Sequence, residues 1–168
     1  MLITEIDKTR YRRHFNIVVT ICISILVVGS LGIAQLLIAF FPAQEGTHFH
    51  WNLLGVILSV VMIGSLFMIK KDDPFFYEVL YVWRLKQALN LIARKLMKLK
   101  QVAKMGDVNA MLALQFSYTG SRQLWMLDDN TITMNSLDKS QSDLDVLLAK
   151  YNVTLDLTLY NSALLKAI

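Results

Sequence analysis

The chain has 168 residues, of which 55% are hydrophobic and 18% charged, and it carries a formal net charge of +4 with a positive mean hydropathy. This composition lies outside the range of a typical soluble domain and is typical of a membrane protein. The only cysteine is Cys22, which excludes an intramolecular disulfide and any zinc or iron–sulfur site built from cysteines.

Two apolar segments are long enough to cross a bilayer. Residues 15–41 contain no charge, and residues 51–69 form a shorter second segment. A hydrocarbon core about 30 Å thick requires roughly 20 helical residues, so both segments qualify. A cleaved signal peptide is the competing interpretation of the first segment, but such peptides have a shorter apolar region and a small-residue cleavage site. The connecting loop, residues 42–50, is too short for a domain, so we predict an antiparallel transmembrane hairpin.

Basic residues lie at only one end of this hairpin. Residues 1–14 contain four lysines and arginines, and Lys70 and Lys71 follow the second span, whereas the loop contains none. Lysine and arginine are retained on the cytoplasmic side of a membrane. The sequence therefore predicts cytoplasmic termini and a cytosolic part that comprises residues 74–168.

Small and polar residues within the spans are candidates for helix packing or for contact with a partner subunit. Small side chains let helix backbones approach closely, and an amide in hydrocarbon requires a hydrogen-bonding partner. No Asp, Glu, Lys, Arg or His lies inside either span, so a proton relay or ion pump has no obvious carrier. The candidates are Gly29, Gly32, Gln35, Gly55, Ser59 and Gly64.

The loop contains the only weak candidates for a metal site. Glu45, His48 and His50 lie within a few residues of one another, and imidazoles with a carboxylate suit zinc or copper. A metal also requires fixed ligand geometry, which a short loop provides poorly. We therefore favour polar anchors beside Trp51 at the outer interface, and we expect no metal or other cofactor.

The chain changes character abruptly after the second span. Lys70 and Lys71 end the span at the headgroups, and Asp73 followed by Pro74 is typical of an N-cap with proline at the first helical position. A new helix is therefore predicted to begin at Pro74 and to run to residue 105. The aromatic residues 75–77 are interpreted either as interface anchors or as core residues of the cytosolic part.

This basic helix, residues 74–105, has an apolar seam. Leucines and similar residues recur at alternating spacings of three and four, which places them on one face and requires a packing partner. The seam includes Val82, Leu85, Leu89, Ile92, Leu96, Leu99 and Ala103.

Between residues 84 and 104 the helix has basic residues and no acidic one, whereas aspartates dominate after residue 105. Three interpretations remain: contact with anionic lipid headgroups, binding of nucleic acid, or a solvated helix whose seam pairs with the acidic C-terminal part or with a second copy. Nucleic acid is the least favoured, because the segment contains no base-reading motif. The candidate headgroup contacts are Lys70, Lys71, Arg84, Arg94, Lys95 and Lys98.

Further helices are predicted to follow. Asp107 caps a segment that Gly120 interrupts or ends, and Ser140 or Ser142 caps a later helix that stops near Asn152. The tail alternates like a strand, yet it has no second strand with which to pair, so we expect it to be helical.

The opening "EIDKTRYRRH", read with the two-span hairpin and the basic helix, resembles a small family of uncharacterised bacterial inner-membrane proteins. The resemblance covers the whole chain. It implies a location in the inner membrane of a Gram-negative bacterium and assigns no activity or site residues.

These patterns favour an all-α integral membrane protein without enzymatic activity. The cytosolic part contains neither His nor Cys and no Gly-rich phosphate loop, and its aspartates lie near turns, where capping explains them. We expect an accessory, assembly or scaffold subunit that contacts membrane lipids and other subunits or copies of itself through its cytosolic helices. The alternative is a homo-oligomer that forms a pore, or a regulator that reads lipid.

Overall fold

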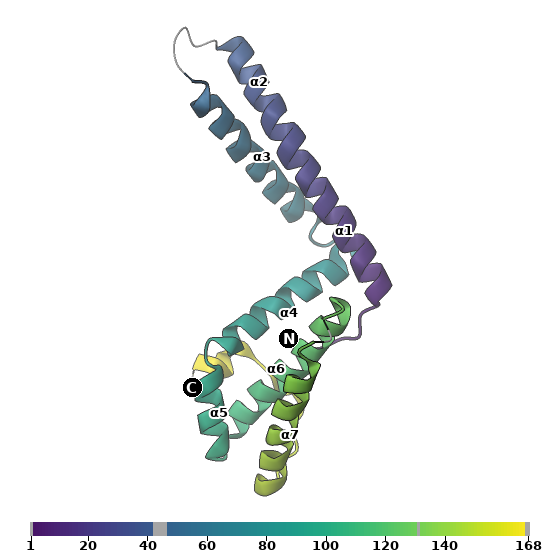
Figure 1. Cartoon of the computed structure of the whole chain (residues 1–168), viewed down its shortest axis with the longest axis vertical. Helices are drawn as coiled ribbons and strands as arrows, with labels where there is room; N and C mark the ends of the chain where they lie inside the picture. Colours follow the sequence, from purple (N-terminus) through teal and green to yellow (C-terminus); the bar gives the residue numbers. More distant parts are fainter. Residues whose placement is uncertain (1, 42–46, 131, 167–168) are drawn as a thin grey trace. The chain divides into compact units, whose positions relative to one another are not determined.

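The computed structural model describes residues 2–41, 47–130 and 132–166 of the chain, and the regular secondary structure in these ranges is entirely helical (Figure 1). The chain divides into two compact units. We call residues 9–80 the hairpin unit, and residues 1–8 with 81–168 the helical unit. The predicted all-helical class is confirmed for the described residues.

The hairpin unit contains two helices that are long and apolar enough to cross a membrane. The first runs without interruption from Lys8 to Phe40 and comprises α1 (Lys8–Ser24), a π-helical turn η1 (Ile25–Gly29) and α2 (Ser30–Phe40). The second is α3 (Phe49–Lys70). Both predicted spans are therefore helices, although the first begins at Lys8 rather than at residue 15, so that the basic N-terminal segment forms its first turns.

Small residues let the two helices of the hairpin approach closely. A Cβ atom on Gly55 would lie 2.5 Å from the Ser30 carbonyl oxygen and 3.2 Å from the Ala34 backbone nitrogen. On the facing side, Gly29 lies against the hydroxyl of Ser59, which is fully buried and donates to the Gly55 carbonyl. Because backbone lies where a side chain would be, Gly55 permits this spacing.

The chain leaves α3 as the sequence predicts. The Asp73 carboxylate accepts a hydrogen bond from the Phe75 N–H at 2.9 Å, and Pro74 occupies the first position of a 3₁₀ turn, η2 (Pro74–Phe76), that leads directly into α4 (Tyr77–Ala93). An extended cap residue followed by proline starts a helix without the loss of a hydrogen bond. The predicted helix start at Pro74 is confirmed.

The predicted single helix over residues 74–105 is wrong in one respect, because it breaks at Arg94 and Lys95 into α4 and α5 (Leu96–Lys104). Neither proline nor glycine causes this break. The Lys95 N–H bonds to the Ile92 carbonyl, one residue closer than in an α-helix. Ile92 and Leu99, on either side of the break, are both completely buried. Packing of both halves against one core therefore outweighs the helical propensity of the segment.

Helix α6 (Val108–Leu127) contributes more buried residues to the core of the helical unit than any other described helix. Asp107 caps it as predicted, because its carboxylate accepts from the Ala110 N–H at 2.7 Å. The predicted interruption at Gly120 is wrong, since α6 continues through it. A Cβ on Gly120 would lie 3.0 Å from Leu85 and 3.2 Å from Leu89. This glycine accommodates α4 and does not mark a turn.

The C-terminal part differs from the prediction at two points. Helix α7 (Met134–Tyr151) begins before Ser140 and ends where predicted, at Asn152, which adopts the left-handed conformation with φ 52°. The tail is neither strand nor α-helix but two 3₁₀ turns, η3 (Leu157–Leu159) and η4 (Ser162–Lys166). Its backbone is fixed by the core, where Tyr160 stacks on Phe116 with ring centroids 3.9 Å apart. Tertiary packing therefore decides the conformation of the tail.

Candidate functional site

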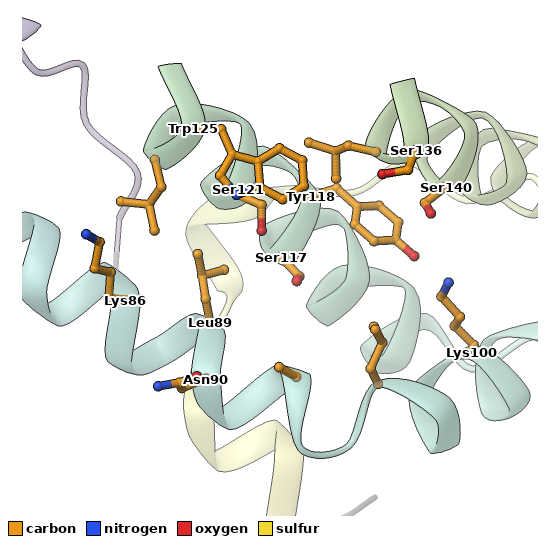
Figure 2. Close-up of a pocket in the computed structure, with 14 residues that line it drawn as sticks. Lys86, Leu89, Asn90, Lys100, Ser117, Tyr118, Ser121, Trp125, Ser136 and Ser140 are labelled. Carbon is orange, nitrogen blue, oxygen red and sulfur yellow. The ribbon is translucent and has the colours of Figure 1, made fainter. Parts of the chain in front are cut away.

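A groove of about 550 Å³ opens between α4, α5, α6 and α7 of the helical unit (Figure 2). Its apolar lining comes from every one of these helices, and hydroxyl groups and two lysines lie among the apolar side chains. The lining residues are Lys86, Leu89, Asn90, Ala93, Leu96, Lys100, Ser117, Tyr118, Ser121, Leu124, Trp125, Ser136, Leu137 and Ser140.

The groove uses the part of the predicted seam that the core leaves partly open. Leu89 and Leu96 are half-buried and line the groove, whereas Leu85, Ile92 and Leu99 are completely buried. The break between α4 and α5 lies between the two groove leucines. The seam therefore has two roles: most of it packs inside the unit, and two of its leucines form an apolar surface that a ligand can reach.

The two lysines of the groove lie in different surroundings. The Lys86 ammonium lies 3.2 Å from the Asp128 carboxylate, and both side chains are about half exposed, so this ion pair contributes little to stability. Lys100 extends towards Tyr118 and Ser140, beside a smaller cavity of about 210 Å³ that Lys104 and Asp143 also line (Figure 2). The described residues that line the larger groove include no carboxylate.

Tyr118 forms part of the boundary between these two cavities. Burial raises the pKa of its phenol, and the negative charge of Asp143 raises it further, whereas a hydrogen bond with Ser140 acts in the opposite direction. The phenol is therefore neutral over the physiological range and serves as a hydrogen-bonding group. No His or Cys occurs in the sequence of the helical unit, so its groove has polar groups for binding but no imidazole or thiol for catalysis.

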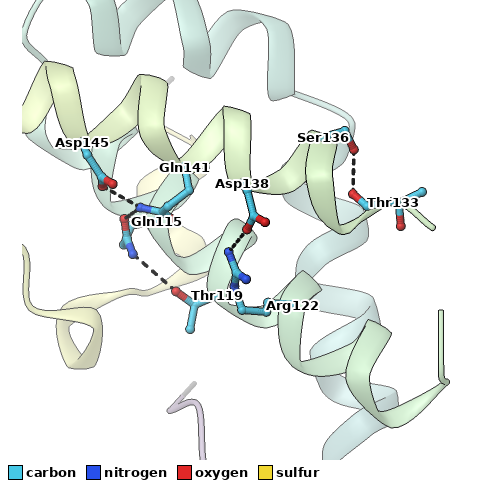
Figure 3. A network of polar contacts seen from close by, with 8 residues as sticks. All are labelled: Gln115, Thr119, Arg122, Thr133, Ser136, Asp138, Gln141 and Asp145. Carbon is cyan, nitrogen blue, oxygen red and sulfur yellow. Dashed lines mark hydrogen bonds and ion pairs between the residues drawn. The ribbon is translucent and has the colours of Figure 1, made fainter. Parts of the chain in front are cut away.

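A network of polar contacts fixes α7 against α6 and so fixes one wall of the groove (Figure 3). The Gln141 amide donates to the Gln115 side-chain oxygen at 2.7 Å and to Asp145 at 2.8 Å. Arg122 pairs with Asp138 at 2.5 Å. Because two of these contacts, Gln141–Gln115 and Arg122–Asp138, join α7 to α6, the wall of the groove has a defined position.

The proposed lipid contacts are mostly exposed. Lys70 and Lys71 lie on the surface of the hairpin unit, and Arg84, Arg94 and Lys98 lie on the surface of the helical unit. Lys95 differs, because it is half-buried and donates to the Leu165 carbonyl at 2.5 Å. Lys95 therefore holds the C-terminal turn in place, and this contact leaves it less available to a headgroup.

The predicted packing residues of the hairpin divide into two groups. Gly29, Gly55 and Ser59 meet between the helices. Gly32, Gln35 and Gly64 do not. A Cβ on Gly32 or on Gly64 would meet nothing within 4 Å, and Gln35 is exposed.

The loop candidates for a metal site remain a prediction. His48 and His50 flank the start of α3, and His50 packs against Trp51 with ring centroids 4.7 Å apart. Glu45 lies outside the described residues. Within the described ranges, no group of three or more His, Cys, Asp or Glu side chains could hold a metal ion.

Two features of the structure were not predicted from the sequence. In the hairpin unit, the Glu78 carboxylate is only 7% exposed and lies 2.8 Å from the Arg10 side chain and 3.2 Å from the His14 ring, which packs on Phe75. Glu78 is the one acidic residue in the predicted basic helix, residues 74–105, and it precedes the run of basic residues that begins at Arg84. This isolated negative charge is the only sequence signal that could have identified it.

The second feature is an N-terminal clasp in the helical unit. The Thr4 N–H donates to the Tyr81 hydroxyl at 2.9 Å, and the Gln123 amide donates to the Thr4 carbonyl at 2.6 Å. The Tyr81 hydroxyl in turn donates to Gln123 at 2.9 Å. These three hydrogen bonds attach the backbone of Thr4 to α4 and α6.

These observations define a protein whose described secondary structure is helical, with two helices that could cross a membrane and a helical unit that contains a groove of mixed polarity. Residues 1–165 match a family described as "Protein of unknown function (DUF3087)", and the chain belongs to this family. No curated protein and no solved structure matches the chain. The expected membership of an uncharacterised family is confirmed.

Proposed function

We propose that this protein is a non-enzymatic accessory, assembly or scaffold subunit of a complex in the inner membrane of a bacterium. The hairpin unit anchors it, with both termini in the cytoplasm, and the helical unit docks a segment of a partner subunit in its groove. The observation that carries this proposal is the groove itself, which combines accessible leucines with Lys86, Lys100 and several hydroxyls and has no carboxylate in its described lining. These groups suit an amphipathic helix with acidic side chains, because its apolar face covers Leu89 and Leu96 while its carboxylates meet the lysines.

The topology is tested separately from the docking. Two helices of suitable length and a Lys/Arg asymmetry support a membrane hairpin with its loop in the periplasm. A reporter that works only in the periplasm should be active when it is inserted in the loop. A reporter that works only in the cytoplasm should be active when it is fused to either terminus. A periplasmic C-terminus would overturn the proposed orientation.

Docking is tested by site-specific photo-crosslinking in native membranes. A photoreactive residue at Ser121, in the groove, should yield an adduct of defined mass, whereas the same residue at Trp83, which is exposed on α4 and outside the groove lining, should not. Charge reversal of the groove, Lys86→Glu with Lys100→Glu, should abolish the adduct by placing negative charge opposite the acidic partner.

The matched control reverses two charges outside the groove, Arg84→Glu with Lys98→Glu, and should leave the adduct unchanged. This control also tests the alternative function, a regulator that binds anionic lipid. The exposed residues Arg84, Arg94 and Lys98 have no ion-pair partner among the described residues, so they are the groups that would contact lipid headgroups. If the control variant loses binding to anionic liposomes and the groove variant does not, the function as a lipid-binding regulator is favoured. A homo-oligomeric pore predicts an adduct with the mass of a second copy.

A further inference from the structure

A second cavity lies within the hairpin unit, where one face of α1 and one face of α3 border an apolar crevice of about 310 Å³. On the first helix the lining residues run from Val18 in α1 to Ile25 at the start of η1, and on α3 they run from Ile63 to Lys70. Each helix contributes positions i, i+3, i+4 and i+7, which form one continuous face. Phe75 and Phe76, which follow α3 in η2, also line the crevice.

The crevice follows from a change in side-chain size along the hairpin. Gly55 brings the two backbones together at α2, whereas in the second half of α3 a Cβ on Gly64 would meet nothing within 4 Å, so no such close contact occurs there. There the bulky side chains of α1 and α3 border the crevice without filling it. The π-helical turn η1 lies between the closely packed region and the crevice, and its first residue, Ile25, is part of the crevice lining.

The lining identifies the chemistry of the occupant. A volume of about 310 Å³ would hold roughly ten water-sized groups at about 30 Å³ each, but a buried water requires two to four polar partners. Only Lys70 and Asp73 of the lining carry charged groups, and Asp73 already caps η2 through the Phe75 N–H. Within the described part of the chain, Lys70 has no ion-pair partner. The site is therefore an apolar slot whose polar end carries the Lys70 ammonium and the helix-capping carboxylate of Asp73.

We propose that this crevice binds one anionic phospholipid, with an acyl chain between α1 and α3 and the headgroup phosphate on Lys70. The proposal rests on the proposed function, because an acyl chain reaches the crevice only if the hairpin spans a bilayer. A chain that leaves bilayer hydrocarbon for an apolar crevice gains no hydrophobic free energy, since both surroundings are equally apolar. Selectivity must then come from the headgroup, where Lys70 favours a negative charge.

Native mass spectrometry of the full chain in mild detergent tests this site, with phosphatidylglycerol and phosphatidylcholine of identical acyl chains as probes. The wild-type protein should retain one phosphatidylglycerol in preference to phosphatidylcholine. Lys70→Gln should lower phosphatidylglycerol retention about fivefold, to the level of phosphatidylcholine, because one lysine is removed from the headgroup. The control Lys71→Gln removes an adjacent charge that does not line the crevice and should have no effect.

Two filling variants test the acyl-chain part of the site without a change in charge. Ile63→Trp should abolish retention of the lipid, and Cys22→Phe provides an independent variant if the first does not fold. Equal losses for Lys70→Gln and Lys71→Gln, equal retention of the two lipids, or retention in a folded filling variant would overturn the proposal. So would a second copy of the chain that occupies the crevice, detected as a dimer without lipid.

The topology reporters separate this result from the proposed function. A hairpin that spans the membrane but retains no selected lipid overturns the lipid site alone. A hairpin that does not span overturns both. Loss of partner docking in the groove variants leaves the lipid site unaffected, since Lys86 and Lys100 belong to the helical unit.

Discussion

The buried Glu78 carboxylate predicts that the two members of its ion pair with Arg10 respond unequally to mutation. Its side chain is 7% exposed, whereas that of Arg10, 2.8 Å away, is 58% exposed. Arg10→Gln removes the arginine and leaves the His14 ring as the other partner of this buried carboxylate among the described residues, so we expect a cost of about 2–3 kcal/mol. Glu78→Gln keeps the shape of the side chain and lets Arg10 return to water, so its cost should be about 1 kcal/mol, as for a partly exposed ion pair.

Amide hydrogen exchange measures this difference locally. Glu78 lies in the first turn of α4, and each 1.4 kcal/mol changes the exchange rate of amides that open with this turn about tenfold. Arg10→Gln should accelerate exchange roughly 30- to 150-fold, and Glu78→Gln roughly fivefold. The control is Arg13→Gln, which removes an exposed charge from α1, the helix that also carries Arg10, and should have no effect on exchange. An equal or larger effect of Glu78→Gln would refute the reasoning, because the cost would then not arise from an unpaired buried charge.

Three further results are expected. Gly55→Ala should destabilise the hairpin by about 1–3 kcal/mol in a detergent titration, because its Cβ would lie 2.5 Å from backbone oxygen, whereas Gly64→Ala, in open space, should not. Gly106→Ala should lower the free energy of unfolding of the helical unit by about 1–2 kcal/mol, measured by Trp fluorescence, since φ is 96° there. Asp143→Asn should lower the raised pKa of Tyr118, so that phenolate absorbance appears at a lower pH. The pKa of Tyr118 is higher in the folded than in the unfolded state, so its contribution to the free energy of unfolding is complete below the unfolded pKa and is lost as the pH rises through the folded pKa.

Some elements of the candidate site could be predicted and others could not. The seam from Val82 to Ala103 follows from spacing alone, and its burial was therefore predictable. Which seam residues remain accessible was not, because Leu89 and Leu96 share the spacing of the buried Leu85 and Leu99 and yet line the groove. The hydroxyls of the groove carry no signal in the sequence, since isolated serines on amphipathic helices are common.

The sequence by itself determined the local features of this protein: two long apolar helices, the cap and proline that start α4, the Asp107 cap and the stop at Asn152. The two helices follow from long uninterrupted apolar runs. The caps and the stop depend on a few adjacent residues, whose hydrogen bonds are made within one turn. Only the tertiary structure decided the break at Lys95, the passage of α6 through Gly120 and the 3₁₀ tail. At each of these points a contact distant in sequence outweighs local propensity, because burial of a whole side chain contributes more free energy than the difference between two backbone conformations.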